Sequence, residues 1–248
     1  MAAGLPEKGP CMAVAIDPTS PADKRTLYCA FYGSGIFKST DGARSWTAKN
    51  AGLKLDRNSH FVDLKRHKDG TLLALCGALR KERVSLAQGS LFRSADGGET
   101  WTDLTDELKL RHPYGFDVDP TDSKVIYLGA SAVPRLHDEA GLYKTADGGK
   151  TWRKLAVPCP KTEISYHHYG WPSVDPYNPQ RVWIACGTHG VLVTTDGGAT
   201  WKELKGIPFR LVSRITVDPQ DHETIWATTF GGGVWTGPAM GIAELHND

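Results

Sequence analysis

The sequence predicts an all-β protein made of about five four-stranded antiparallel sheets that follow one another along the chain. Three observations lead to this prediction. A turn motif that ends in tryptophan recurs four times. A second motif, an apolar run that stops at Asp-Pro, also recurs four times. Short β-rich runs with even spacing lie between these motifs, which is typical of all-β architectures.

The composition excludes several classes of partner. The 29 basic and 28 acidic residues nearly cancel, to a formal net charge of +1. Such a balance gives no electrostatic footprint for nucleic acid or for an anionic membrane surface. No apolar run is long enough for membrane insertion, and Met1–Pro10 does not resemble a signal peptide. We therefore expect a soluble protein without nucleic-acid or membrane partners, whose compartment stays unknown.

The turn motif has the pattern hydroxyl, any residue, Asp, Gly, small, any residue, hydroxyl, Trp. Its copies are Ser39–Trp46, Ser94–Trp101, Thr145–Trp152 and Thr194–Trp201. Asp-Gly between two apolar runs favours a hairpin, because glycine tolerates positive φ and aspartate accepts hydrogen bonds from nearby amides. The flanking hydroxyls can bond the remaining turn groups, and the tryptophan can cover the hairpin. A repeat of about 50 residues is typical of a propeller or another array.

This motif resembles the Asp box, the repeat of sialidases, sortilin-type receptors and xyloglucan-hydrolysing propellers. The resemblance covers nearly the whole chain and implies a β-propeller whose box hairpins lie away from the active face. We accordingly interpret the aspartate and tryptophan of each copy as structural. These residues are Asp41, Trp46, Asp96, Trp101, Asp147, Trp152, Asp196 and Trp201.

Each repeat is predicted to hold strands A, B, C and D, with D beginning at the box tryptophan. Strand A stops at Asp17-Pro18, Asp119-Pro120, Asp175-Pro176 and Asp218-Pro219, since proline cannot continue a ladder, and Phe61–His67 takes this place in the second repeat. Strand B is expected at Thr26–Phe31, Thr71–Cys76, Val125–Gly129, Val182–Cys186 and Thr224–Thr229. Strand C is expected at Gly35–Lys38, Ser90–Arg93, Gly141–Lys144, Gly190–Val193 and Gly233–Thr236.

We expect a single domain over residues 1–248, with blades near 11–50, 58–105, 112–156, 165–205 and 210–238. The fifth repeat has no Asp box, and its tail is short and polar. Three alternatives stay open: the N-terminal segment closes the ring, the fifth blade lacks its outer strand, or the chain is part of a larger propeller. The segments Ala78–Gln88 and Ala130–Ala140 are predicted to be irregular loops between strands B and C.

The five cysteines show neither CxxC spacing nor an even count, so we expect buried free thiols and no disulfide framework. No cofactor or metal site is predicted. Histidines are plentiful, but no pair has the spacing of a known ligand motif.

Ligand residues are expected where B–C loops and D–A connections open on one face of the blades. Loops on a rigid scaffold often carry binding residues, and aromatic rings beside arginine suit a sugar or an acidic sugar. An ordinary solvated rim is the alternative. The candidates are His60, Arg80, Arg83, His112, Tyr114, Arg135, His137, His168, Tyr169, Trp171, His189, Arg214 and Phe230.

The favoured function is recognition of a saccharide or a protein partner on this face, and the catalytic residues stay unknown. The alternative is a glycoside hydrolase or a polysaccharide lyase. Hydrolysis needs two carboxyl groups about 5 to 9.5 Å apart, and the candidates are Asp63, Glu82, Asp117, Asp138 and Glu139. A lyase could use His167, His168 and Tyr169 with a nearby arginine. Sialidase activity is disfavoured because the Phe-Arg-Ile-Pro segment of sialidases is missing.

Overall fold

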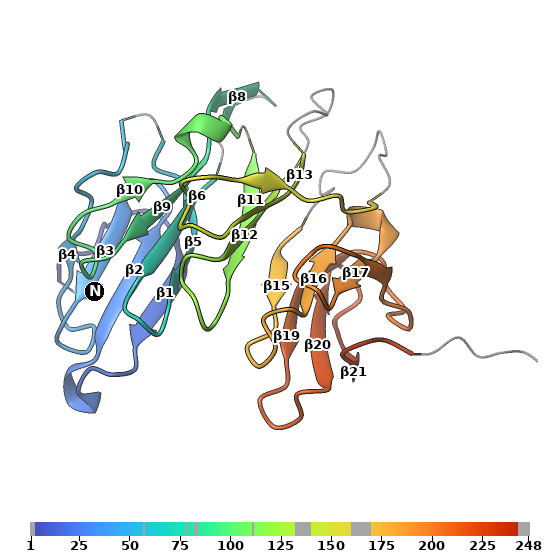
Figure 1. Cartoon of the computed structure of the whole chain (residues 1–248). Coiled ribbons are helices and arrows are strands. Elements are labelled where there is room, and N and C mark those ends of the chain that lie inside the picture. Colours follow the sequence, from blue (N-terminus) through green and yellow to red (C-terminus); the bar gives the residue numbers. More distant parts are fainter. Residues whose placement is uncertain are drawn as a thin grey trace, which may run out of the picture. The chain divides into compact units, whose positions relative to one another are not determined.

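The computed structural model describes residues 3–56, 58–77, 79–81, 84–110, 112–131, 140–159 and 170–242. In this part of the chain, regular structure is antiparallel β apart from three short 3-10 turns (Figure 1). The chain forms two compact units, Met1–Pro113 and Tyr114–Asp248. The single domain expected over residues 1–248 stays a prediction.

The first unit contains two four-stranded blades. Blade 1 consists of β1 (Cys11–Asp17), β2 (Thr26–Phe31), β3 (Gly35–Ser39) and β4 (Thr47–Ala48) in that order. Blade 2 consists of β5 (Phe61–Arg66), β6 (Leu72–Cys76), β9 (Ser90–Ser94) and β10 (Thr102–Asp103). A separate hairpin, β7 (Leu79–Lys81) and β8 (Val84–Ala87), is inserted between β6 and β9. The prediction of an irregular loop over Ala78–Gln88 was therefore wrong.

The second unit contains three blades. Blade 3 consists of β11 (Pro113–Val118, starting at the last residue of the first unit), β12 (Ile126–Ala130), β13 (Gly141–Thr145) and β14 (Arg153–Lys154). Blade 4 consists of β15 (Pro172–Val174), β16 (Val182–Ala185), β17 (Val191–Thr194) and β18 (Lys202–Glu203). Blade 5 consists of β19 (Val212–Val217), β20 (Thr224–Thr229) and β21 (Val234–Pro238). The 3-10 turns are η1 (Ala22–Lys24), η2 (Asp106–Leu108) and η3 (Gly187–His189).

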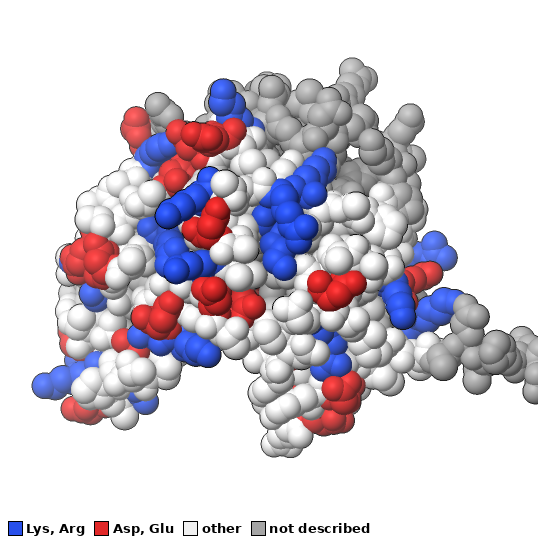
Figure 2. All heavy atoms as spheres, in the orientation of Figure 1, with Lys and Arg blue, Asp and Glu red and all other residues white. Residues whose placement is uncertain are grey.

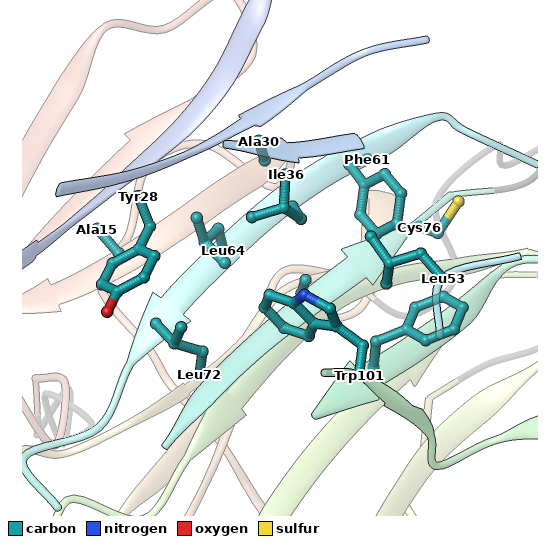
Figure 3. Packing of buried hydrophobic residues seen from close by; sticks show 12 residues of the cluster. Ala15, Tyr28, Ala30, Ile36, Leu53, Phe61, Leu64, Leu72, Cys76 and Trp101 are labelled. Carbon is teal, nitrogen blue, oxygen red and sulfur yellow. The ribbon is translucent and has the colours of Figure 1, made fainter. Parts of the chain in front are cut away.

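The predicted architecture of sequential antiparallel blades is confirmed, and most strands match their predicted bounds within a residue or two. Each outer strand is only two residues long and begins one residue after the box tryptophan, not at it. The apolar core lies between blades. Side chains from β1, β2 and β3 meet those from β5, β6 and β9, with the Trp101 indole among them (Figure 3). Close packing of this kind provides most of the stability of stacked sheets.

The Asp-box hairpins are closed by their own side chains, as the second copy illustrates. Ser94 Oγ donates to Asp96 Oδ1 (2.7 Å) and accepts the Gly98 amide (2.8 Å). The Asp96 carboxylate then accepts the Thr100 amide (3.0 Å) and hydroxyl (2.5 Å). Hydrogen bonds from Thr100 lower the pKa of Asp96 to about 2. Hydrogen bonds from the box hydroxyls likewise lower the pKa of Asp41, Asp147 and Asp196.

A second set of bonds joins the boxes of blades 2 and 4 to the preceding blade of the same unit. Tyr127 of blade 3 donates its hydroxyl to the Gly197 carbonyl of the blade 4 box (3.1 Å). Lys144 donates to the same oxygen (2.8 Å). In the first unit, Lys38 of blade 1 donates to the Gly97 carbonyl of the blade 2 box (2.9 Å). The boxes therefore fasten one blade to the next, in addition to shaping their own turns.

The fifth repeat lacks the Asp box but keeps part of its backbone geometry. The Ala239 amide donates to the Glu223 carbonyl (2.7 Å), as the Gly197 amide of the blade 4 box does to the Gln180 carbonyl (2.9 Å). Trp183 of blade 4 donates to the Ala239 carbonyl (2.9 Å). The turn is thus held from the preceding blade although its aspartate is missing.

All five cysteines are free, as expected. Four of them are buried, but Cys11 is exposed, so the expectation of burial was wrong for that residue. Burial raises the pKa of the Cys29 and Cys76 thiols to about 12.

Candidate ligand-binding site

The first strands of the second unit align on the Asp-Pro turn that ends each of them. Gly115, Trp171 and Arg214 each lie four residues before the aspartate of that turn, in blades 3, 4 and 5. They therefore hold equivalent places on three consecutive blades. Each of these residues lies in or just before the first strand of its blade. Residues far apart in the sequence therefore occupy corresponding positions in consecutive blades.

The side chains at these positions contact one another from blade to blade. The Trp171 indole lies over Gly115, where a Cβ atom would come within 2.5 Å of Cδ1 and Cγ of the indole ring. Its ring centroid is 5.0 Å from that of Tyr114, at an angle of 58°. The Arg214 guanidinium carbon lies 4.7 Å from the centroid of the Trp171 ring, within the range of a cation–π interaction. We call Tyr114, Trp171 and Arg214 the aromatic–arginine cluster.

Local backbone geometry supports this placement of Arg214. The register of the β19–β20 pairing shifts between Val212 and Arg214, as it does at a β-bulge. The same irregularity occurs at the start of β1 and at the start of β5. Bulges bend a strand and redirect side chains, and they are frequent near binding sites. Arg214 is exposed, whereas Trp171 is half-buried.

The cluster combines a fixed positive charge with neutral donors. An arginine stays protonated throughout the accessible pH range. Burial raises the pKa of Tyr114, so its phenol stays neutral near pH 7 and keeps its hydroxyl proton. Across the surface in view, basic and acidic side chains are interspersed and no large region carries a single sign (Figure 2). The cluster therefore offers a ligand one fixed positive charge and a neutral hydroxyl donor beside a large apolar ring.

In the first unit the structure brings the candidate His60 together with an aromatic residue from the neighbouring blade. The Tyr32 and His60 rings stack with centroids 4.0 Å apart and an angle of 16° between planes. Tyr32 lies in the B–C loop of blade 1, and His60 precedes the first strand of blade 2. The Gly33 amide also donates to the Ser59 carbonyl (2.8 Å). For these two blades, a B–C loop and a D–A connection thus lie side by side.

The remaining described candidates lie before β11, in η3, on β7 and in a B–C loop. His112 is half-buried before β11, and His189 is half-buried in η3. Phe230 is exposed in the B–C loop of blade 5. For Arg80, on β7, only the backbone is described. Five candidates lie outside the described residues, namely Arg83, Arg135, His137, His168 and Tyr169.

The two described carboxylates considered for hydrolysis, Asp63 and Asp117, both accept backbone hydrogen bonds. Asp117 accepts the Val118 amide (2.9 Å) with one oxygen and the Val174 amide of blade 4 (2.8 Å) with the other. Asp63 is buried and accepts the Leu64 amide (2.9 Å). These bonds favour structural roles. Glu82, Asp138, Glu139 and His167 lie outside the described residues.

Two general properties follow from the described ranges. Within them, no group of three or more histidine, cysteine, aspartate or glutamate side chains is placed to hold a metal ion. In the same ranges no helix is long and apolar enough to cross a membrane.

Sequence reasoning did not single out Gly115. Its role depends on a tryptophan from another blade that fills the space where a side chain would lie. Counting back from each Asp-Pro turn would have found it, since this count also selects Trp171 and Arg214.

Comparison with known proteins gives partial matches. A family model described as sortilin, neurotensin receptor 3, matches residues 89–206. A xyloglucanase from Paenibacillus sp is 30% identical over 183 residues, which cover 64% of this chain and 17% of that protein. The photosystem II assembly lipoprotein Ycf48 from Picosynechococcus sp. is 24% identical over 168 residues, covering 67% of this chain and 42% of that protein. The chain thus spans less than half of the length of either relative.

Among solved structures, the xyloglucanase from Xanthomonas campestris has a TM-score of 0.67 at 19% identity. The match covers 93% of this chain and 36% of that one. At this identity the likeness concerns the fold.

Proposed function

Since the chain is a β-propeller of the Asp-box type, we propose that it binds a neutral polysaccharide of the xyloglucan kind through the aromatic–arginine cluster. The observation that carries this proposal is the contact of Trp171 with Tyr114 and Arg214 across three consecutive blades. The relatives named xyloglucanase support the ligand class.

The chemistry of the cluster suits such a ligand. A pyranose ring has an apolar face that stacks on an indole, and its rim carries hydroxyl groups. Trp171 offers the large apolar ring, and the tyrosine hydroxyl and the arginine N–H groups can bond the hydroxyls. Sites that bind small molecules commonly combine aromatic walls with a few fixed polar groups. The guanidinium is held by its stacking on the indole, so less side-chain freedom is lost on binding.

Isothermal titration calorimetry with a panel of oligosaccharides tests the proposal. The panel contains xyloglucan and cello-oligosaccharides as neutral members and oligogalacturonate as the acidic member. We expect binding to neutral members, weakened about tenfold or more by Trp171→Ala, because the stacking surface is lost. Arg214→Ala should weaken binding by a smaller factor.

Tyr177→Ala is the matched control, since this exposed tyrosine lies in an A–B turn, stacked on His222 (3.3 Å between centroids). It should leave the affinity unchanged. Equal affinity of Trp171→Ala and the unaltered chain would contradict the proposal. Failure of every panel member to bind would instead favour a protein partner, the kind of role that the name of the Ycf48 relatives describes.

Hydrolysis is the second candidate, and the match to xyloglucanases favours it. It is tested in the same panel by measuring the release of reducing ends over time. Release from xyloglucan would assign hydrolase activity. Release from oligogalacturonate together with an unsaturated product would assign lyase activity instead.

A further inference from the structure

Two cysteines meet inside the second unit, where blade 3 packs against blade 4. Cys159 lies in the segment that follows β14 of blade 3, and Cys186 directly follows β16 of blade 4. Both side chains are buried in the apolar cluster between these blades, together with Leu155 and Ile184. A hydrogen bond joins the two thiols. Two reduced sulfur atoms from neighbouring blades are therefore in contact with each other.

The first unit has the same interface with a different pair of residues. Leu53 and Cys159 each lie seven residues after the tryptophan of an Asp box. Cys76 and Cys186 each lie four residues after the strand-B residue that pairs with the opening hydroxyl of a box. In the first unit, Leu53 and Cys76 are buried in one cluster (Figure 3). The second unit therefore has a thiol at the place of Leu53, and this thiol completes a pair.

We propose that Cys159 and Cys186 are a redox-active pair that closes to a disulfide and so bonds blade 3 covalently to blade 4. The oxidant is a low-molecular-weight disulfide, RSSR. The thiolate of Cys159, which is 9% exposed against 2% for Cys186, attacks one sulfur of RSSR and releases RS⁻. The thiolate of Cys186 then attacks Cys159 Sγ in the mixed disulfide, forms the new S–S bond and releases a second RS⁻. The two protons lost by the cysteines convert both RS⁻ to RSH, so two electrons pass from the pair to RSSR.

The surroundings of the pair determine how it reacts. The hydrogen bond with Cys159 and burial both raise the pKa of Cys186, so this thiol stays protonated near pH 7. Because the attacking species is the thiolate, the closing step is slow at neutral pH and becomes faster as the pH rises. Once formed, the bond closes a loop of about 28 residues and restricts the unfolded chain. This stabilisation does not depend on saccharide binding.

Peptide mapping by mass spectrometry tests the pair directly. The full chain is incubated with 2-hydroxyethyl disulfide at mildly alkaline pH, alkylated in urea and digested with trypsin. We expect peptides 155–161 and 182–202 to be recovered as one species joined by a disulfide. Cys76 is the internal control, because it is buried as deeply as Cys186 but has Leu53 at the partner position, and it should be recovered alkylated. Absence of the joined peptides, or equal recovery of peptides joined through Cys76, would overturn the proposal.

Thermal unfolding measures what the bond does to the fold. Oxidation should raise the unfolding midpoint of the unaltered chain by roughly 5–10 °C, and dithiothreitol should reverse the gain. Cys159→Leu introduces the residue of the first unit and removes the pair, so oxidation should not raise its midpoint. Cys11→Ser removes the exposed thiol, keeps the pair and should show the full gain.

Two results of this measurement would contradict the proposal. One is an equal gain in Cys159→Leu and in the unaltered chain. The other is an unchanged midpoint in a chain whose joined peptides have been found, since the bond would then not fasten the blades. The peptide map uses the unaltered chain, so it tests the pair even if Cys159→Leu does not fold.

Discussion

Ser94 shows how a single hydroxyl organises a turn. Its oxygen donates to Asp96 and accepts the buried Gly98 amide, so it satisfies groups on both sides of the hairpin. The sequence pattern predicted this role, because a hydroxyl before Asp-Gly is a local signal. It did not predict the role of Gly115, which depends on a ring from another blade.

Replacing that hydroxyl tests the turn directly. Ser94→Ala leaves the Gly98 amide buried without its acceptor, so we expect a loss of about 1–3 kcal/mol in the free energy of unfolding. Urea denaturation measures this difference. Ser213→Ala, at an exposed position on β19, is the control and should change stability little. Equal midpoints for the two variants would contradict the assigned role.

At the scale of the element, the boxes make the folded state sensitive to acid. Hydrogen bonds hold the pKa of Asp96 at about 2, below its value in an unfolded chain, and lower the other three box aspartates as well. A carboxyl with a lowered folded-state pKa contributes stability above its unfolded pKa of about 4. That contribution is lost as the pH falls through the folded value.

We therefore expect the free energy of unfolding to fall steadily from about pH 4 toward pH 2. Urea titrations at a series of pH values measure the slope. Asp96→Asn should make the slope shallower, because one of the titrating groups is removed. An unchanged slope in this variant would show that the acid sensitivity comes from other carboxyl groups.

The bonds between blades are also testable element by element. Tyr127→Phe removes the hydroxyl that donates to the Gly197 carbonyl and leaves the ring in place. We expect a destabilisation of about 0.5–1.5 kcal/mol. Tyr177→Phe, on an exposed turn, is the matched control. A loss that is no larger than in this control would mean that Lys144 alone holds the box carbonyl.

The strands themselves were predictable from β-rich runs between two punctuating motifs. The β7–β8 hairpin was not, because Glu82-Arg83 in its connection carries none of the glycine, asparagine or aspartate signals of tight hairpin turns. The outer strands were placed one residue early, because the tryptophan belongs to the turn and only two residues after it pair.

At the scale of the whole molecule, the repeat determines the class of fold but only part of the site. Topology brought Tyr32 to His60 and Trp171 to Arg214, as loops and strand starts on one side of a blade would suggest. Which candidates make contact depends on side-chain size at equivalent positions, and Gly115 beside Trp171 is the clearest case. The alternation of apolar and polar residues along a strand does not show which side chains of neighbouring blades touch.

Fluorine NMR of the chain labelled with 5-fluorotryptophan tests the central claim that the aromatic–arginine cluster binds saccharide. The chain has eight tryptophans, and Trp171→Phe assigns the resonance of interest. On titration with a xyloglucan oligosaccharide, we predict that the Trp171 resonance shifts while those of the buried Trp101 and Trp183 stay in place. Binding that leaves the Trp171 resonance unmoved would contradict the account.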